Sequence, residues 1–596
     1  MFNKLFNSRI LIFIIILLTA FACFKNKRWK TGSIILHDVL SYYSYLPATF
    51  IYHDLTFEFR KNQPPEIQNK IYTPRTEDGR IVQQMTLGLA LLLLPFFFLA
   101  HLYSILNLLP ANGYTDVYEL SIACAALFYF ATGLAYLRKS LKTFFDEKTT
   151  TLTLLAMAFA TNLFYYATYE NGMSHVYSFC MFSIFLWLTI KWHKENSFLN
   201  SILTGFILGM ITLIRPTNCV IFIFFILYNI RDKESLINKI SYFRKNVKQI
   251  LLIGTAAFLP LTLQLMYWKF ASGHWIYYSY RDQGFFFTKP HVFEGLFGFR
   301  KGLFIYTPVM LMILPGIWFA FKHKKSYAVA VSVFFLVNVY IIFSWWCWPY
   351  GGGFGSRATI ESYALLALPF AGFISQCFLN GWIKKTFVII SIAFCIALNL
   401  FQTEQAKWSL IHYDGMNMKL YFKIFGSTNF PDNYSAYLTP YDNENALHGL
   451  LERPIFSVDI NSIKHLQSFS TNLKGDNGKY VCSELNNNGI LKCNRNDPYA
   501  WETFVFNLYA ENLCTVQSCD KKYFSLKKDD SFKIVADLNQ TDYSVAFKIF
   551  SIGNNTFSLM ASNGLFVIID KKNDGELKAN EPEQKKAAIF TMQKIR

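Results

Sequence analysis

Long apolar runs recur through most of this 596-residue chain and constrain its fold more than any other feature. A run of about 20 apolar residues is long enough for one helix to cross the hydrocarbon core of a membrane. Hydrophobic residues make up 53% of the sequence and charged residues only 16%, which is more apolar than a single soluble core requires. The sequence therefore predicts a polytopic α-helical membrane protein.

Basic loops between the apolar runs predict the topology. We expect about eleven transmembrane helices, near residues 10–24, 116–137, 151–168, 174–192, 198–214, 217–230, 249–270, 303–321, 327–345, 361–380 and 386–402. Lysines and arginines gather after the second, fourth, sixth, eighth and tenth spans, all on one side, and such loops face the cytoplasm. The net charge of +18 thus sets topology rather than indicating a nucleic-acid partner.

The two ends of this scheme also carry expectations. The C-terminus falls on the external, periplasmic side of an inner membrane. The first run is a signal anchor or, because Ala20-Phe21-Ala22 resembles a cleavage site, a signal peptide. The apolar run at 88–106 is expected to lie in or dip into the outer leaflet, because a crossing there would reverse the side of every later basic loop. Residues 25–115 then form one large external loop with interfacial helices.

Ionisable side chains collect in the predicted external loops. Such groups are costly at membrane depth, so each is a candidate functional residue. Asp38 is the candidate catalytic residue, and Asp54 in the same loop is interpreted as a helix-end or supporting residue. The candidates for binding substrate or phosphate are His37, Glu170, His175, Arg215, Arg300, Lys301 and Arg357.

Each candidate also has a structural interpretation. Asp38 is placed to cap a helix that begins at Val39. Arg300 and Lys301 are placed to extend their charged ends to the membrane interface. His175 alone is more often a packing residue than a catalyst. As a set, however, one carboxylate, several cations and an aromatic loop on one face fit sugar transfer from a lipid phosphate. That reaction needs a base for the acceptor hydroxyl and cations for the phosphate leaving group.

Several stretches of the chain resemble the GT-C superfamily of membrane glycosyltransferases, in particular bacterial relatives of the protein O-mannosyltransferases and lipid A aminoarabinose transferases. They are HDVLSYYSYLPA, LLLLPFFFLAHLY, MSHVYSF, LIRPTN, FGFRKGLFIYTP and GGGFGSR, within residues 1–425. The resemblance implies a polyprenyl-phosphate sugar donor and transfer on the external face. By it, Asp38 matches the first-loop acidic residue that binds or activates the acceptor, while Arg300, Lys301 and Arg357 are candidates for the donor phosphate. In the family a second carboxylate often follows, whereas Val39 stands there in this chain. The external loops contain no DxD triplet, so no divalent-metal site is evident, although a metal is not excluded.

The C-terminal region repeats every 43 residues. Residues 1–402 are expected to form the transmembrane domain, 403–470 an external connector and 471–596 an all-β domain of three repeats. The repeat shows in three triplets: Tyr480, Tyr523 and Phe566; Leu491, Ile534 and Leu577; Phe504, Phe547 and Phe590. Recurring apolar positions in short strands suit a β-trefoil with one shared core. The stretches GKYV, GIL and WETF resemble the fascin-like trefoils.

Four cysteines fall in this β region, and the other seven lie in or near apolar runs as packing residues. An even number in a polar external region predicts two disulfides among Cys482, Cys493, Cys514 and Cys519, with the first two facing each other across a hairpin. A zinc site is the alternative, although the spacing matches no standard finger.

The leading hypothesis is an inner-membrane glycosyltransferase. It would move a sugar from polyprenyl phosphate to a glycan, lipid or protein acceptor. The alternatives are a transporter or flippase of lipid-linked glycans, which would place charges midway through spans, and a non-catalytic membrane scaffold that displays a glycan-binding trefoil.

Overall fold

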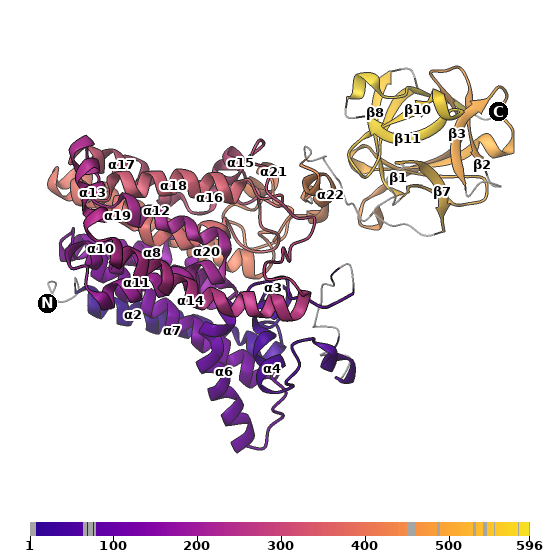
Figure 1. Ribbon diagram of the computed structural model, residues 1–596. Coiled ribbons are helices and arrows are strands. Elements are labelled where there is room, and N and C mark those ends of the chain that lie inside the picture. The colour runs from indigo at the N-terminus through magenta and orange to yellow at the C-terminus, as the bar shows by residue number, and fades with distance from the viewer. Residues whose placement is uncertain are drawn as a thin grey trace. The chain divides into compact units, whose positions relative to one another are not determined.

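The computed structural model describes residues 7–63, 68, 76, 79–439, 441–449, 460–484, 489–527, 532–539, 545–553, 555–581 and 583–594. The chain divides into two compact units, Met1–Ser409 and Leu410–Arg596. The first unit is helical, and the second contains all the named strands (Figure 1).

Helices of the first unit occupy each of the eleven predicted positions. They are α2 (Ser8–Asn26), α7 (Asp116–Leu141), α8 (Glu147–Phe159) with α9 (Leu163–Thr168), α10 (Ser174–Lys194), α11 (Phe198–Ile214), η3 (Pro216–Ile221) with α12 (Phe222–Leu227), α14 (Val247–Ser272), α16 (Leu303–Tyr306) with η4 (Pro308–Met312) and α17 (Ile313–Lys322), α18 (Ala328–Phe343), η5 (Arg357–Ser362) with α19 (Tyr363–Leu379), and α20 (Trp382–Lys407). Within the described residues, six helical segments are long and apolar enough to cross a membrane: α2, α6, α7, α14, α19 with η5, and α20. The unit is therefore that of a membrane protein, while eleven crossings stay a prediction.

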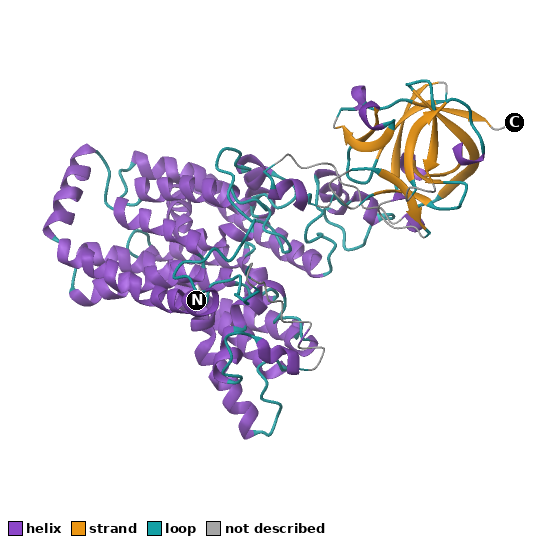
Figure 2. Ribbon diagram, turned by 45° about the vertical axis from the view of Figure 1, so that its right-hand side comes forward, coloured by secondary structure: helices purple, strands orange, loops and turns teal. Residues whose placement is uncertain are grey.

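Helix α6 (Gly88–Leu106) differs from its neighbours in direction. It slopes away from the helical bundle in both views (Figures 1 and 2). Its first residue packs tightly on the end of α11, since a Cβ at Gly88 would lie 2.5 Å from the backbone nitrogen of Ile214. Its far half exposes apolar side chains, including Leu99, Leu102 and Leu106. Exposed apolar surface on a helix that departs from the bundle suits a lipid environment, although α6 is also long enough to span.

Loops predicted to share one side of the membrane lie at the same end of the helical unit. The backbone amide of Ser8 donates to Glu147 at 2.7 Å, and Lys142 pairs with the same carboxylate at 2.8 Å. The amide of Asn229 donates to the carbonyl of Ser326 at 2.8 Å. Helix α13 (Lys233–Lys245) lies at this end, whereas α3 (His37–Tyr43) and α15 (Val292–Phe297) lie at the other (Figure 1).

Aromatic residues of the first predicted external loop bond to distant parts of the same loop. It contains η1 (Arg28–Thr31), α3, α4 (Tyr45–Phe50) and η2 (Glu58–Asn62). The buried Tyr43 hydroxyl donates to the carbonyl of Gly113 at 2.6 Å, and Tyr45 donates to that of Met85 at 2.7 Å. Asp54 accepts backbone hydrogen bonds of 2.8 Å from Thr56 and Phe59, so it supports the turn into η2.

The second unit is a closed antiparallel barrel with three hairpins. Its strands are β1 (His465–Gly475), β2 (Tyr480–Glu484), β3 (Ile490–Arg495), β4 (Thr503–Tyr509), β5 (Leu513–Gln517), β6 (Tyr523–Leu526), β7 (Ile534–Leu538), β8 (Phe547–Gly553), β9 (Thr556–Met560), β10 (Phe566–Asp570), β11 (Glu576–Glu581) and β12 (Phe590–Lys594). Pairings β1–β4, β4–β5, β5–β8, β8–β9, β9–β12 and β12–β1 close the barrel (Figure 2). The hairpins are β2–β3, β6–β7 and β10–β11, and β3 pairs with both β7 and β11. Before the barrel come α21 (Met418–Ile424), η6 (Tyr434–Tyr437), α22 (Asn443–Leu447) and η7 (Ile460–Ser462).

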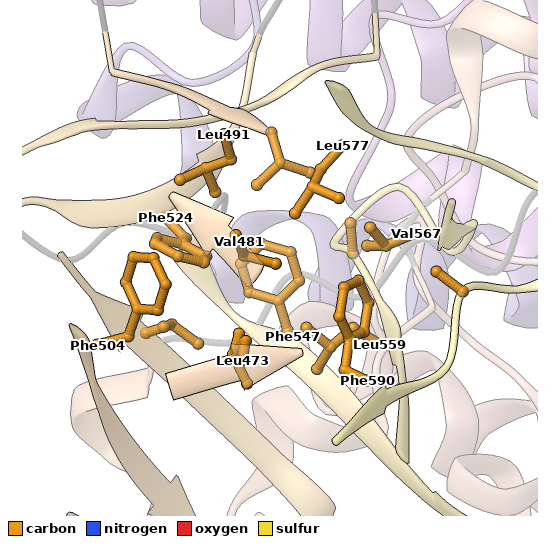
Figure 3. Close-up of a cluster of buried hydrophobic side chains, with 14 of the residues drawn as sticks. Leu473, Val481, Leu491, Phe504, Phe524, Phe547, Leu559, Val567, Leu577 and Phe590 are labelled. Carbon is orange, nitrogen blue, oxygen red and sulfur yellow. The ribbon is translucent and has the colours of Figure 1, made fainter. Parts of the chain in front are cut away.

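The 43-residue repeat builds the barrel core. Phe504, Phe547 and Phe590 begin or nearly begin β4, β8 and β12, and all three are at most 1% exposed. The second triplet, Leu491, Ile534 and Leu577, lies in the third strand of each repeat and joins the same buried cluster (Figure 3). The prediction of one shared core is confirmed for these two triplets, whereas Tyr480, Tyr523 and Phe566 lie outside this buried cluster and Tyr523 is only half-buried.

The predicted disulfides are wrong. Cys482, Cys493, Cys514 and Cys519 are all free. The first two do lie on facing strands, but Cys482 is opposite Lys492 and Cys493 is opposite Val481. Side chains alternate between the two faces of a strand, so the two thiols point to opposite faces of the hairpin. Cys514 is buried in the barrel core, and Cys519 is exposed.

Candidate functional site

Asp38 lies in the first turn of α3, and its side chain forms an ion pair. The N-cap of α3 is Leu36, without a side-chain hydrogen bond. Asp38 Oδ2 accepts a hydrogen bond of 3.1 Å from Nη2 of Arg357 in η5. The Asp38 side chain is 34% exposed, whereas that of Arg357 is 14% exposed. The interpretation of Asp38 as a helix cap is therefore wrong, and its carboxylate is the accessible half of a charge pair.

A second ion pair lies one turn further along η5. Glu361 Oε1 accepts a 2.9 Å hydrogen bond from Arg215 Nη1 and lies 3.2 Å from His175 Nδ1. The Glu361 and His175 side chains are each 3% exposed. Arg215 follows α11, and His175 lies in the first turn of α10. Segments far apart in the chain thus meet around two carboxylates and two guanidinium groups.

Two polar atoms of this cluster have no hydrogen-bond partner among the described residues. They are Arg357 Nε and Glu361 Oε2, and both are buried. Buried polar atoms in folded proteins are almost always bonded, so an unsatisfied one calls for a water or ligand. The cluster therefore offers one unused donor next to the accessible carboxylate of Asp38.

Tyrosines surround the charges. The Arg215 guanidinium lies over the ring of Tyr350 at 5.4 Å, and the Tyr42 hydroxyl lies 3.4 Å from that of Ser174. Burial raises the pKa of Tyr42, Tyr280 and Tyr350, so these phenols stay protonated. They remain neutral and do not compete with the two carboxylates for the guanidinium groups.

The glycine-rich segment before Arg357 is fixed by contacts. The amide of Phe354 donates a 3.2 Å hydrogen bond to the Tyr166 hydroxyl, and the carbonyl of Phe354 accepts one of 3.1 Å from the Asn162 side chain. Gly353 has φ +138°, and a Cβ there would lie 2.4 Å from the Tyr166 hydroxyl. Lys301, 3% exposed, donates to the carbonyl of Gly351. The segment is thus a packed loop that leads Arg357 to Asp38.

Four of the eight predicted site residues meet in this cluster: Asp38, His175, Arg215 and Arg357. Lys301 reaches it only through the glycine-rich loop. Glu170 instead pairs with Arg28 at 2.8 Å. His37 is exposed, with a left-handed φ of 50°, and Arg300 is half-buried before α16.

Two positioning residues are absent from the sequence predictions. Glu119, fully buried in α7, accepts hydrogen bonds of 3.2 Å from the amides of Ile34 and Ile35, just before α3. Arg28 donates 2.8 Å to the carbonyl of Ser33 as well as pairing with Glu170. The one local feature that could have drawn attention to Glu119 is its position, since it is a carboxylate in the first turn of a predicted transmembrane helix.

The cluster has the groups for base chemistry and for anion binding. Asp38 is a partly exposed carboxylate, and the guanidinium groups of Arg215 and Arg357 beside it are suited to an anion, with Lys301 bonded to the adjoining glycine-rich loop. Within the ranges that the structure describes, no three His, Cys, Asp or Glu side chains are grouped to hold a metal ion. The fold and site together define a helical membrane unit with an ion-pair cluster at one end, followed by a β-barrel.

No family model matches this chain, and no curated protein matches it. Among solved structures it is similar to the archaeal oligosaccharyltransferase AglB from Archaeoglobus fulgidus in complex with an inhibitory peptide and a dolichol-phosphate, at 12% identity over 67% of this chain and 56% of that one, with a TM-score of 0.43. It is also similar to the Archaeoglobus fulgidus oligosaccharyltransferase in the apo form, at 12% identity over 75% of this chain and 61% of that one, with a TM-score of 0.41. The chain spans about six tenths of the length of these structures. Likeness at this level carries no argument about the reaction.

Proposed function

We propose that the helical unit is a glycosyltransferase that moves a sugar from a polyprenyl-phosphate donor to an acceptor hydroxyl at the external face of the inner membrane. The observation that carries the proposal is the Asp38–Arg357 pair, in which a partly exposed carboxylate meets a buried guanidinium with an unused Nε–H. It is supported by an apolar helical bundle suited to a lipid-linked substrate and by the residue pattern that resembles GT-C enzymes.

The chemistry assigns a role to each charged group. Asp38 takes the proton of the acceptor hydroxyl as its oxygen attacks C1 of the sugar. The bond between C1 and the phosphate oxygen breaks, and its electron pair leaves with the polyprenyl phosphate. Arg357 and Arg215 stabilise the negative charge on that phosphate, where a guanidinium fork matches the phosphate oxygens. Arg300 and Lys301 are proposed to add positive charge for the donor phosphate, and Glu361 holds Arg215 in place.

The proposal includes a topology. We infer eleven crossings, α6 in the outer leaflet and the C-terminal unit on the external side. The basic loops support this topology, as do the contacts among loops at the α13 end of the unit. The direction of α6, which slopes away from the helical bundle, supports its place in the outer leaflet (Figure 1). The acceptor is a glycan, a lipid or a protein.

We also assign the C-terminal barrel to the β-trefoil class. The support is its strand pairing, in which six barrel strands and three hairpins recur with the 43-residue repeat. A closer kinship with fascin-like trefoils rests on the sequence pattern alone.

Release of polyprenyl phosphate from a labelled polyprenyl-phosphate sugar tests the function. Protein in lipid nanodiscs should cleave the donor when an acceptor is supplied, and Asp38→Asn should lower the rate about 100-fold or more. Asp54→Asn is the matched control, because Asp54 lies in the same loop and only supports η2. Equal rates for wild type and Asp38→Asn would remove Asp38 from the chemistry. Movement of the lipid-linked sugar across a vesicle bilayer with no bond cleaved would favour the flippase instead.

A further inference from the structure

A cavity of about 440 Å³ opens on the C-terminal unit between β3 and β4. It is lined by residues within the segment 495–502, which joins these two strands. Its volume falls within the range of about 300–1,000 Å³ that is usual for small-molecule sites in proteins. The helical site and the proposed transfer reaction do not use this cavity.

Two aromatic side chains, those of Tyr499 and Trp501, are among the lining residues. Tyr499 is 76% exposed and Trp501 is 48% exposed. The other exposed large apolar side chains described between residues 465 and 594 are aliphatic: Leu466, Ile552 and Ile589. Aromatic rings offer a broad flat face at little conformational cost, so an exposed pair beside a cavity is suited to a flat apolar partner.

The aromatic pair stands on a rigid turn. Glu502, 3% exposed, accepts a 2.8 Å hydrogen bond from the amide of Tyr499, and its own amide donates 3.2 Å to the Tyr499 carbonyl. Arg495 bridges Glu502 and Glu484 at 3.8 and 2.6 Å. A surface fixed before binding loses little entropy when a ligand arrives.

Charge selects the class of ligand. Arg495 is the cation of the cavity, and two carboxylates, Glu484 and Glu502, already hold it. The lining itself contains two carboxylates, Asp497 and Glu502, and the amide of Asn496. An excess of carboxylates disfavours phosphate, sulfate and nucleic acid, whereas hydroxyl groups bond readily to both carboxylate and amide.

The fold does not require these aromatic residues. By the 43-residue repeat, the counterparts of Tyr499 are Asp542 and Lys585, and those of Trp501 are Ser544 and Ala587. Core positions keep the same residue type in each repeat, as Phe504 and Phe590 show, whereas the pair Tyr499 and Trp501 occurs in the first repeat only. Aromatic residues that the shared core leaves unexplained indicate a ligand.

We propose that this cavity binds an uncharged glycan, with a pyranose ring stacked on Trp501 and Tyr499 and sugar hydroxyls bonded to Asp497 and Asn496. The ring C–H groups of a sugar cover the aromatic face while its hydroxyls reach the polar lining. The inference goes beyond the proposed transferase and stands without it, because it concerns a surface of the C-terminal unit alone.

Calorimetric titration of the full chain tests this site. The protein is held in nanodiscs, because sugar-based detergents would compete. The probes are mannohexaose, cellohexaose and chitohexaose, with heparin as the polyanion. At least one neutral probe should bind, and Trp501→Ala and Asp497→Ala should each weaken it tenfold or more. Trp501→Phe should retain most of the affinity, which separates loss of the platform from loss of folding.

Lys585→Ala is the matched control, because Lys585 is the exposed counterpart of Tyr499 in the third repeat, and it should bind like wild type. Three outcomes would overturn the proposal: no binding of any neutral probe, binding that survives Trp501→Ala, or preferential binding of heparin. Donor cleavage should persist in Trp501→Ala, and glycan binding should persist in Asp38→Asn, so failure here is distinct from failure of the proposed function.

Discussion

The carboxylate of Asp38 accepts a 3.1 Å hydrogen bond from the guanidinium of Arg357, 319 residues further along the chain. A similar pair lies next to it, in which Glu361 accepts a 2.9 Å hydrogen bond from Arg215. The two pairs differ in access, because the Asp38 side chain is 34% exposed and that of Glu361 only 3%. The exposed carboxylate is free to exchange its partner for a substrate, whereas the buried one has a structural role. This asymmetry leads to separate predictions for the two pairs.

A double-mutant cycle on the first pair should show strong coupling in activity. Asp38→Asn should lower donor turnover about 100-fold or more, and Arg357→Gln about 100-fold, because one removes the base and the other a cation on the leaving group. The double variant should be little worse than Asp38→Asn alone, since residues that act as a unit are not additive. Turnover of the four proteins with the labelled donor is the measurement. Losses that simply multiply would show that the two residues act independently.

Glu361, the buried carboxylate of the second pair, should affect stability more than chemistry. Glu361→Gln leaves the guanidinium of Arg215 buried without a carboxylate, which should cost about 3–5 kcal/mol. Thermal unfolding in nanodiscs measures the loss, and Glu361→Gln combined with Arg215→Met should recover part of it. Glu170→Gln is the control, because its ion pair with Arg28 is 30% exposed at the carboxylate and should cost about 1 kcal/mol or less. An unfolding temperature unchanged in Glu361→Gln would contradict this role.

The sequence predicts this site only in part, for a physical reason. Apolar runs locate the helices, because the length and composition of a span are local properties. Asp38 and Arg357 stand out because they are ionisable residues in the predicted external loops, where such groups are costly at membrane depth. Glu119 does not stand out, although it holds the amides of Ile34 and Ile35, because its partners lie 84 and 85 residues away. Only the packing of α7 against the loop before α3 reveals that role.

The register of strand pairing also limits what the sequence can predict, as the cysteines of the barrel show. The spacing of Cys482 and Cys493 predicts facing strands, and β2 does pair with β3. A one-residue difference in pairing decides whether two side chains share a face. The hairpin carries a register shift between Tyr480 and Val481, which local sequence does not announce. Facing strands were therefore predictable, and facing thiols were not.

Thiol labelling should follow this register. Burial raises the pKa of the Cys482 thiol to about 12 and that of Cys493 to about 11, so neither forms much thiolate near pH 8. Of the four cysteines in the barrel region, Cys519 should react with a maleimide in the folded protein and the others should not. A Cys519→Ser variant should lose that label, and a reducing agent should leave the unfolding temperature unchanged. A fall in that temperature on reduction would reveal a disulfide after all.

Acid should loosen the end of the helical unit where Ser8 meets α8. Burial opposes ionisation of Glu147, but hydrogen bonds from Lys142 and Ser8 outweigh it and lower the pKa to about 2 from 4.5. A depressed folded-state pKa stabilises the fold above the unfolded pKa, and that contribution disappears as the pH falls from about 4.5 toward about 2. The difference in unfolding temperature between wild type and Glu147→Gln should therefore shrink over this range. The exposed Glu234 of α13 supplies the control substitution, Glu234→Gln, which should change the unfolding temperature little.

The barrel should respond to a core substitution as one cooperative unit. Phe504, Phe547 and Phe590 hold equivalent positions in the three repeats, and each is at most 1% exposed. Replacing any one by alanine removes a buried ring and leaves a cavity, which costs about 3–5 kcal/mol. Hydrogen–deuterium exchange of the full chain reports where that loss appears.

In Phe547→Ala the exchange should rise in β1–β4 and β9–β12 as well as in β5–β8, because the three repeats contribute to one buried cluster. Ile552→Ala is the matched control on the same strand, β8, where the side chain is 50% exposed and its loss should change the free energy of unfolding by less than about 0.5 kcal/mol. Faster exchange confined to β5–β8 would mean that each repeat is stable by itself. Because the hairpins alone are too short to bury their apolar faces, we expect the loss of protection to spread through all the strands.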